Sequence, residues 1–181
     1  RDHNDCKLVS YNAETGDHIA ELYSETDAKY VEPQHPIMFL PWDNSKFILQ
    51  SQKDGYNHLY LFNKDGKQLK QLTSGPWVVE NVVGFNNEKH TVIILSNECN
   101  PIQRNIFSVN VDTGKRAHID EDGEGWHSAQ LSTSGKYLVD SYSAPEIPRN
   151  IAIINTENAK CTRYFTAENP WKGYAVPEYK S

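Results

Sequence analysis

The chain has 181 residues, enough for one domain of ordinary size with one substantial core. Only 38% of the residues are hydrophobic, but 11% are aromatic, so disorder is not expected. The formal net charge is −6, with no cluster of Lys and Arg, which argues against nucleic acid or an anionic membrane as partner. No run approaches the roughly 18 apolar residues that a membrane span needs, so we expect none in this segment.

Short strand-like runs follow one another along the chain, and no long amphipathic helix interrupts them. Residues 8–11 and 18–22 are joined by a turn, and we expect them to be the last two strands of a unit that begins upstream. Three fuller units follow, each with two strands around a polar turn, a third strand, a tight turn and a short outer strand. Their runs are 39–49, 58–62 and 68–73, then 84–94, 105–109 and 116–119, then 130–139, 150–154 and 161–165.

The units repeat at a nearly constant interval. Leu40, Phe85 and Leu131 hold corresponding places and lie 45 and 46 residues apart. Four strands per unit at this period indicate a β-propeller, whereas the strands of a sandwich do not repeat in register. We therefore expect an all-β fold: a partial β-propeller of about three four-stranded antiparallel blades plus part of a preceding blade.

The period also predicts the organisation of the chain. Residues 1–27 are expected to hold the final strands of the preceding blade, and 169–181 an exit linker. The three blades are expected at about 28–75, 76–122 and 123–168. Because the sequence starts without Met and a strand begins almost at once, we expect an excised fragment.

Three segments resemble the propeller of the dipeptidyl peptidase IV family. They are Ser51–Phe62 (SQKDGYNHLYLF), Leu72–Val79 (LTSGPWVV) and Ser132–Ser143 (STSGKYLVDSYS), in the family's order and spacing. The resemblance runs from about Tyr30 to the C-terminus. It implies an N-terminal propeller from a serine peptidase of the prolyl oligopeptidase type, followed by a C-terminal α/β-hydrolase domain that is absent from this chain.

The same resemblance implies a function. The parent protein would be a serine-type dipeptidyl peptidase, secreted or periplasmic, and this fragment would gate and orient peptide substrate for its own hydrolase domain. The family's paired glutamates, which hold the substrate amine, lie upstream of this sequence. No G-x-S-x-G nucleophile motif occurs here, so we expect no catalytic residue, and the fragment alone should be inactive. No cofactor is implied.

The stretch from Tyr30 to Pro36 is the candidate for substrate contact. Its prolines and aromatic residue indicate a stiff connection between blades. In the family that it resembles, this connection runs close to the central cavity, so Tyr30, Val31 and Glu32 are candidates for lining a subsite. The alternative is that these side chains simply pack between blades.

Other conspicuous residues favour structural roles. The seven histidines show no i, i+4 pair, so no metal site is predicted. His58 is expected to make structural hydrogen bonds, and Trp42, Trp77 and Trp126 to pack in the core. The acidic run 120–125 lacks the spacing of a calcium loop and is interpreted as a solvated loop between blades.

Two other functions stay open. The propeller could be a non-catalytic interaction scaffold, or an enzyme with a site in its own channel. An incomplete propeller also leaves unpaired strand edges and uncovered apolar faces, so we expect this chain to associate into homo-oligomers.

Overall fold

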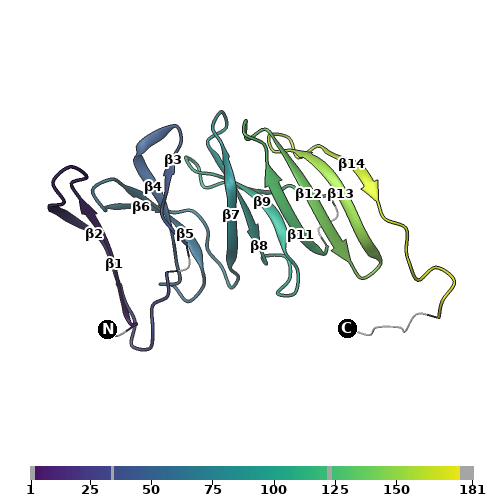
Figure 1. The fold of residues 1–181 in the computed structure, drawn as a ribbon, viewed down its shortest axis with the longest axis horizontal. Coiled ribbons are helices and arrows are strands. Elements are labelled where there is room, and N and C mark those ends of the chain that lie inside the picture. The colour runs from purple at the N-terminus through teal and green to yellow at the C-terminus, as the bar shows by residue number, and fades with distance from the viewer. Residues whose placement is uncertain (1–2, 34, 122–123, 176–181) are drawn as a thin grey trace.

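The computed structural model describes residues 3–33, 35–121 and 124–175. In these residues the secondary structure consists of fourteen strands joined by turns and loops. They contain no helix that is long and apolar enough to cross a membrane. The strands form one hairpin and three four-stranded sheets, which follow one another in chain order along the long axis of the molecule (Figure 1).

All neighbouring strands are antiparallel. The hairpin pairs β1 (Asp5–Tyr11) with β2 (His18–Thr26). The first complete sheet contains β3 (Met38–Leu40), β4 (Asp43–Ser51), β5 (His58–Asn63) and β6 (Gln68–Gln71). The second contains β7 (Val79–Asn86), β8 (Thr91–Ser96), β9 (Asn105–Asn110) and β10 (Arg116–His118). The third contains β11 (Trp126–Leu131), β12 (Tyr137–Ala144), β13 (Ile147–Asn155) and β14 (Cys161–Thr166).

The tight turns predicted before each outer strand are present. The turn between β5 and β6 has Gly66 at φ 86°, and the corresponding turn of the second sheet has Gly114 at φ 78°. The third sheet places Ala159 at φ 58° in the same role, although alanine is disfavoured in this left-handed conformation. The position in the repeat therefore sets the backbone, and glycine only makes it less costly.

The core is divided among the junctions between sheets. On β8, Val92 and Ile94 belong to the apolar cluster shared with the first sheet, whereas Ile93 and Leu95 belong to the cluster shared with the third. Alternate residues of a strand point to opposite faces, so a continuous apolar run buries both faces of a middle strand. The same alternation explains why the third sheet, which ends the series, buries only one face.

The other face of the third sheet is largely uncovered. Leu138 and Ile154 are buried against the second sheet. On the same strands, Tyr137, Val139 and Ile153 are 50%, 44% and 42% exposed. The third sheet thus presents a partly apolar face that no other sheet in the described part of the chain covers.

A backbone link recurs between successive sheets. The N–H of Val79, at the start of β7, donates to the carbonyl of Asn57 at 2.8 Å. The N–H of His127, in β11, donates to the carbonyl of Arg104 at 3.0 Å. Each link joins the first strand of one sheet to the loop between the two middle strands of the sheet before it, so the junctions have a common plan.

One sequence interpretation is wrong at this second junction. The side chain of Asp120, expected in a solvated loop, is fully buried. Its carboxylate accepts the N–H of Ile106 at 2.6 Å, which provides the polar partner that a buried charge requires. Residues 122 and 123 of the same run lie outside the described residues.

Candidate functional site

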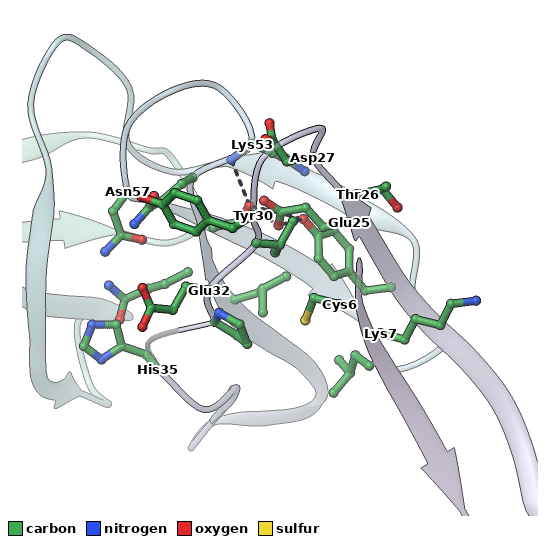
Figure 2. Close-up of a pocket in the computed structure, with 18 of the residues that line it drawn as sticks. Cys6, Lys7, Glu25, Thr26, Asp27, Tyr30, Glu32, His35, Lys53 and Asn57 are labelled. Carbon is green, nitrogen blue, oxygen red and sulfur yellow. Dashed lines mark hydrogen bonds between the residues drawn. The ribbon is translucent and has the colours of Figure 1, made fainter. Parts of the chain in front are cut away.

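A pocket of about 520 Å³ lies between the β1–β2 hairpin and the first complete sheet. Its walls come from β1, β2, the connection to β3, the strand β4 and the turn that leads to β5 (Figure 2). The structure brings the three sequence candidates together here, because Tyr30, Val31 and Glu32 all line this pocket.

The backbone of the connection is held by the N-terminal residues. The N–H of Val31 donates to the carbonyl of His3 at 2.7 Å, and the N–H of Asp27 donates to the carbonyl of Asn4 at 3.0 Å. Tyr30 is 60% exposed, so its ring is not packed in the core of this chain. Val31 is half-buried and Glu32 is exposed. The segment therefore offers an aromatic ring, an aliphatic side chain and a carboxylate at one wall.

Beside this wall, a hydrogen-bonded network joins the hairpin to the first sheet (Figure 2). The carboxylate of Glu25 on β2 accepts the hydroxyl of Tyr23 at 2.5 Å and the hydroxyl of Ser51 on β4 at 2.6 Å. The Ser51 oxygen in turn accepts the N–H of Lys53 at 3.1 Å. Burial, followed by the bond to Glu25, raises the pKa of Tyr23 well above its usual value. The phenol is therefore a fixed donor at neutral pH, and the network positions side chains rather than transferring protons.

Sequence reasoning missed this network. Tyr23 and Glu25 stand two residues apart on β2 and so share one face of the strand, which is the only local signal. Ser51 comes from another sheet, 26 residues further along the chain. No strand pattern could pair it with Glu25 in advance.

Lys53 closes the pocket on the side of the first sheet. Its ammonium lies 4.0 Å from the ring centre of Tyr60 and 5.6 Å from those of Tyr23 and Phe62. Burial lowers the pKa of Lys53, while the charge of Glu25 favours the ammonium form. Lysine over aromatic rings is an attractive arrangement, so this side chain also ties the hairpin to the sheet.

The lining as a whole is mixed in character. Acidic and basic side chains both contribute, together with apolar ones and neutral amides, which suits a polar chain with apolar side chains, such as a peptide. The acidic members are Glu25, Asp27 and Glu32, and the basic ones are Lys7, Lys29 and Lys53.

The remaining conspicuous residues lie elsewhere. His58 is buried and bonds to Thr73 and to the carbonyl of Gly75, the structural role expected of it. Trp77 is in the first apolar cluster, and the partly buried Trp42 packs against that cluster. Trp126 differs from the expectation, because it is 49% exposed with the Arg104 guanidinium 4.5 Å above its ring. It starts the first strand of the last sheet, where only one neighbouring sheet can cover it.

A comparison with known families decides which family this propeller comes from. Residues 1–149 match the family model described as the dipeptidyl peptidase IV (DPP IV) N-terminal region. The chain belongs to the DPP IV N-terminal region family. The resemblance seen in the sequence is thereby confirmed.

Curated relatives of this DPP IV family chain are peptidases by name. It is 30% identical to a dipeptidyl-aminopeptidase B of Aspergillus oryzae, over 95% of this chain and 20% of that protein. It is 27% identical to a dipeptidyl peptidase 4 of Aspergillus flavus, over 82% of this chain and 19% of that protein. The chain thus spans about a fifth of the length of these relatives.

Solved structures agree with the DPP IV assignment and confirm the predicted partial propeller. A dipeptidyl aminopeptidase IV of Bacteroides ovatus superposes with a TM-score of 0.86 at 42% identity, over 95% of this chain and 27% of that one. Porphyromonas gingivalis dipeptidyl peptidase 4 superposes with a TM-score of 0.78 over 92% of this chain and 23% of that one. At 24% identity, the second comparison supports the fold alone.

Proposed function

We propose that this chain is part of the propeller domain of a serine-type dipeptidyl peptidase, and that its pocket helps to gate and orient the peptide substrate. The observation that carries the proposal is that Tyr30, Val31 and Glu32 line one pocket in a chain of the DPP IV N-terminal region family. The named peptidases among its relatives support the reaction class. In this proposal the blades are residues 28–75, 76–122 and 123–168, and the last of them leads to a hydrolase domain.

The division of labour follows from the side chains present. A serine-type peptidase acylates a serine and releases the acyl group with water, and this requires a nucleophile beside a base. The hydroxyls of Tyr23 and Ser51 instead donate to Glu25. The pocket therefore contributes position: Tyr30 and Val31 supply apolar contact, and Glu32 a hydrogen-bond acceptor. Holding a peptide in one orientation lowers the entropic part of the barrier. The proposed location is periplasmic or secreted.

The test compares two equally exposed tyrosines in the protein that joins this chain to its hydrolase domain. Tyr30 and Tyr11 are 60% and 61% exposed, but only Tyr30 lines the pocket. We expect Tyr30→Ala to lower kcat/KM on a Pro-containing dipeptide reporter by about tenfold, or about 1.4 kcal/mol, and Tyr11→Ala to leave it unchanged. Equal effects of the two substitutions would contradict the role of the pocket.

Two further outcomes bear on the alternatives. The 181-residue chain alone should show no turnover of the reporter. Activity that copurifies with it would refute the proposal that the hydrolase domain performs the chemistry and this chain only positions the substrate. Peptide binding without hydrolysis by the longer protein would favour an interaction scaffold instead.

A further inference from the structure

The first junction, between the first and second complete sheets, and the second junction, between the second and third, are built alike but use different side chains. At the first, the hydroxyl of Thr73 accepts the N–H of Leu59 at 3.0 Å, from 14 residues earlier. At the second, the carboxylate of Asp120 accepts the N–H of Ile106 at 2.6 Å, again from 14 residues earlier. Asp120 is thus the charged counterpart of Thr73.

A buried histidine stands at each junction, but their partners differ in what they can donate. At the first, Nδ1 of His58 lies 3.1 Å from the Thr73 hydroxyl and Nε2 lies 3.0 Å from the carbonyl of Gly75. A neutral imidazole satisfies both contacts, because Nε2–H donates to the carbonyl and Nδ1 accepts the hydroxyl hydrogen. The first junction therefore needs no extra proton.

At the second junction both ring nitrogens face acceptors. Nδ1 of His127 lies 2.7 Å from Oδ2 of Asp140, and Nε2 lies 3.1 Å from the carbonyl of Glu124. A neutral imidazole has one N–H, and neither a carboxylate nor a carbonyl can donate. Both bonds form only while the His127–Asp140 pair holds an additional proton, on whichever of the two groups. Both side chains are fully buried, so water cannot replace a lost bond.

The surroundings of the His127–Asp140 pair favour binding of this additional proton. Burial alone would lower the pKa of His127, but the bond to Asp140 and the charge of Asp120, whose Oδ1 lies 3.7 Å from Nε2, raise it. Burial raises the pKa of Asp140 as well. Burial also opposes ionisation of Asp120, yet the bond from His118 at 2.8 Å and the charge of His127 keep its pKa below the usual value.

Each element packed around His127 contributes to the balance. Tyr142 on β12 stacks on the imidazole with ring centres 4.6 Å apart. Arg104, which binds the carbonyl of His127 at 2.7 Å, lies 3.7 Å from Glu80. Arg163 on β14 is paired with Glu121 at 3.0 Å. The two nearby arginines therefore each contact a glutamate, and the imidazole of His127 lies between Asp120 and Asp140.

We propose that Asp120, His127 and Asp140 form a pH-dependent clamp between the second and third sheets. With the proton present, the imidazolium joins Asp120, which follows β10, to Asp140 on β12. When rising pH removes it, one buried hydrogen bond of His127 is lost and the positive charge between Asp120 and Asp140 disappears, so the junction loosens. A raised pKa in the folded state means that this stabilisation is complete below the unfolded value and is lost as pH rises through the folded one. The junction built on Thr73 should not respond.

Amide hydrogen exchange of the 181-residue chain tests the clamp with an internal control. The N–H of His127 reports the second junction and the N–H of Val79 the first, because they make corresponding bonds. As the pH rises from about 6 through the folded pKa of His127, we expect the protection factor of the His127 amide, corrected for intrinsic exchange, to fall by about tenfold or more. That of Val79 should change less than about twofold over the same range. Parallel behaviour of the two amides would overturn the proposal.

A pair of matched substitutions separates the clamp from a general effect of alkali. In Asp140→Asn the new amide can donate to Nδ1, so a neutral His127 satisfies both contacts and the pH dependence should disappear. Asp112→Asn is the control, since Asp112 also contacts a histidine, His90, at 2.7 Å but in an exposed position. It should leave the fall in protection intact. A fall that persists in Asp140→Asn would refute the clamp, and if that variant does not fold, the comparison of the two wild-type amides still decides.

Discussion

Gly66 packs against the backbone of Leu22 with no space for a Cβ between them. The turn between β5 and β6 therefore rests on β2, and a Cβ at position 66 would overlap the carbonyl of Leu22. Gly66 also has φ 86°, a backbone conformation that residues with a side chain adopt at a cost. Two separate penalties thus apply at this one position.

Gly66→Ala should destabilise the chain more than Gly114→Ala. Gly114 occupies the corresponding turn at φ 78°, but nothing lies within 4 Å of the Cβ that alanine would add. We expect about 1 kcal/mol for Gly114→Ala from the backbone alone, and roughly 2–4 kcal/mol for Gly66→Ala, because the hairpin must also move. Urea unfolding of both variants measures the difference. Equal losses would show that the contact with Leu22 is not maintained in solution.

The junction cores should respond to truncation as a packed interior does. Ile93 is fully buried in the cluster between the second and third sheets, whereas Ile102 is 80% exposed. Ile93→Ala should lower the free energy of unfolding by about 2–5 kcal/mol, and Ile102→Ala by less than about 0.5 kcal/mol. A small loss at Ile93 would mean that the two sheets are not packed together as the structure has them.

The sequence was sufficient for the fold because the repeat determines it. The recurring positions of Leu40, Phe85 and Leu131 predict the units, and the alternation along Val92–Leu95 shows that a middle strand is covered on both faces. The tight turns follow from residues such as Gly66. These signals are local, and the same rules apply in every unit.

The polar contacts were less predictable because they cross between sheets. Asp120 looked solvated from its acidic neighbours, and its burial depends on Ile106 and on His118, whose positions only the folded sheet brings together. The resemblance drew attention to Tyr30, but Glu25 was not recognised, since its partner Ser51 belongs to another sheet. Composition describes a segment, whereas burial of a charge depends on which distant group lies opposite.

Tyr23→Phe should cost stability at neutral pH, and this cost should become smaller at alkaline pH. The pKa of Tyr23 is raised in the folded state by burial and by its bond to Glu25. For a group with a raised folded pKa, the stabilisation is complete below the unfolded value, near 10, and is lost as pH rises above it. At neutral pH we expect Tyr23→Phe to cost about 0.5–1.5 kcal/mol for the lost hydrogen bond.

Above about pH 10 the difference between wild type and Tyr23→Phe should shrink, because only the wild type has this phenol to ionise on unfolding. Unfolding curves measured across this range give the comparison. Tyr11→Phe serves as the control, since Tyr11 is 61% exposed on the neighbouring strand β1. A constant difference between wild type and Tyr23→Phe would contradict the raised pKa.

The uncovered face of the third sheet should make this chain associate. Val139 and Ile153 are 44% and 42% exposed at paired positions of neighbouring strands, and exposed apolar side chains gain free energy when a second copy covers them. Sedimentation velocity should show dimers or larger species whose share increases with concentration. Val139→Lys should shift the distribution toward monomer by placing a charge on that face, while Ile102→Lys, in a loop of the second sheet, should not. A monomer at all accessible concentrations, or equal effects of the two substitutions, would show that this face does not mediate association.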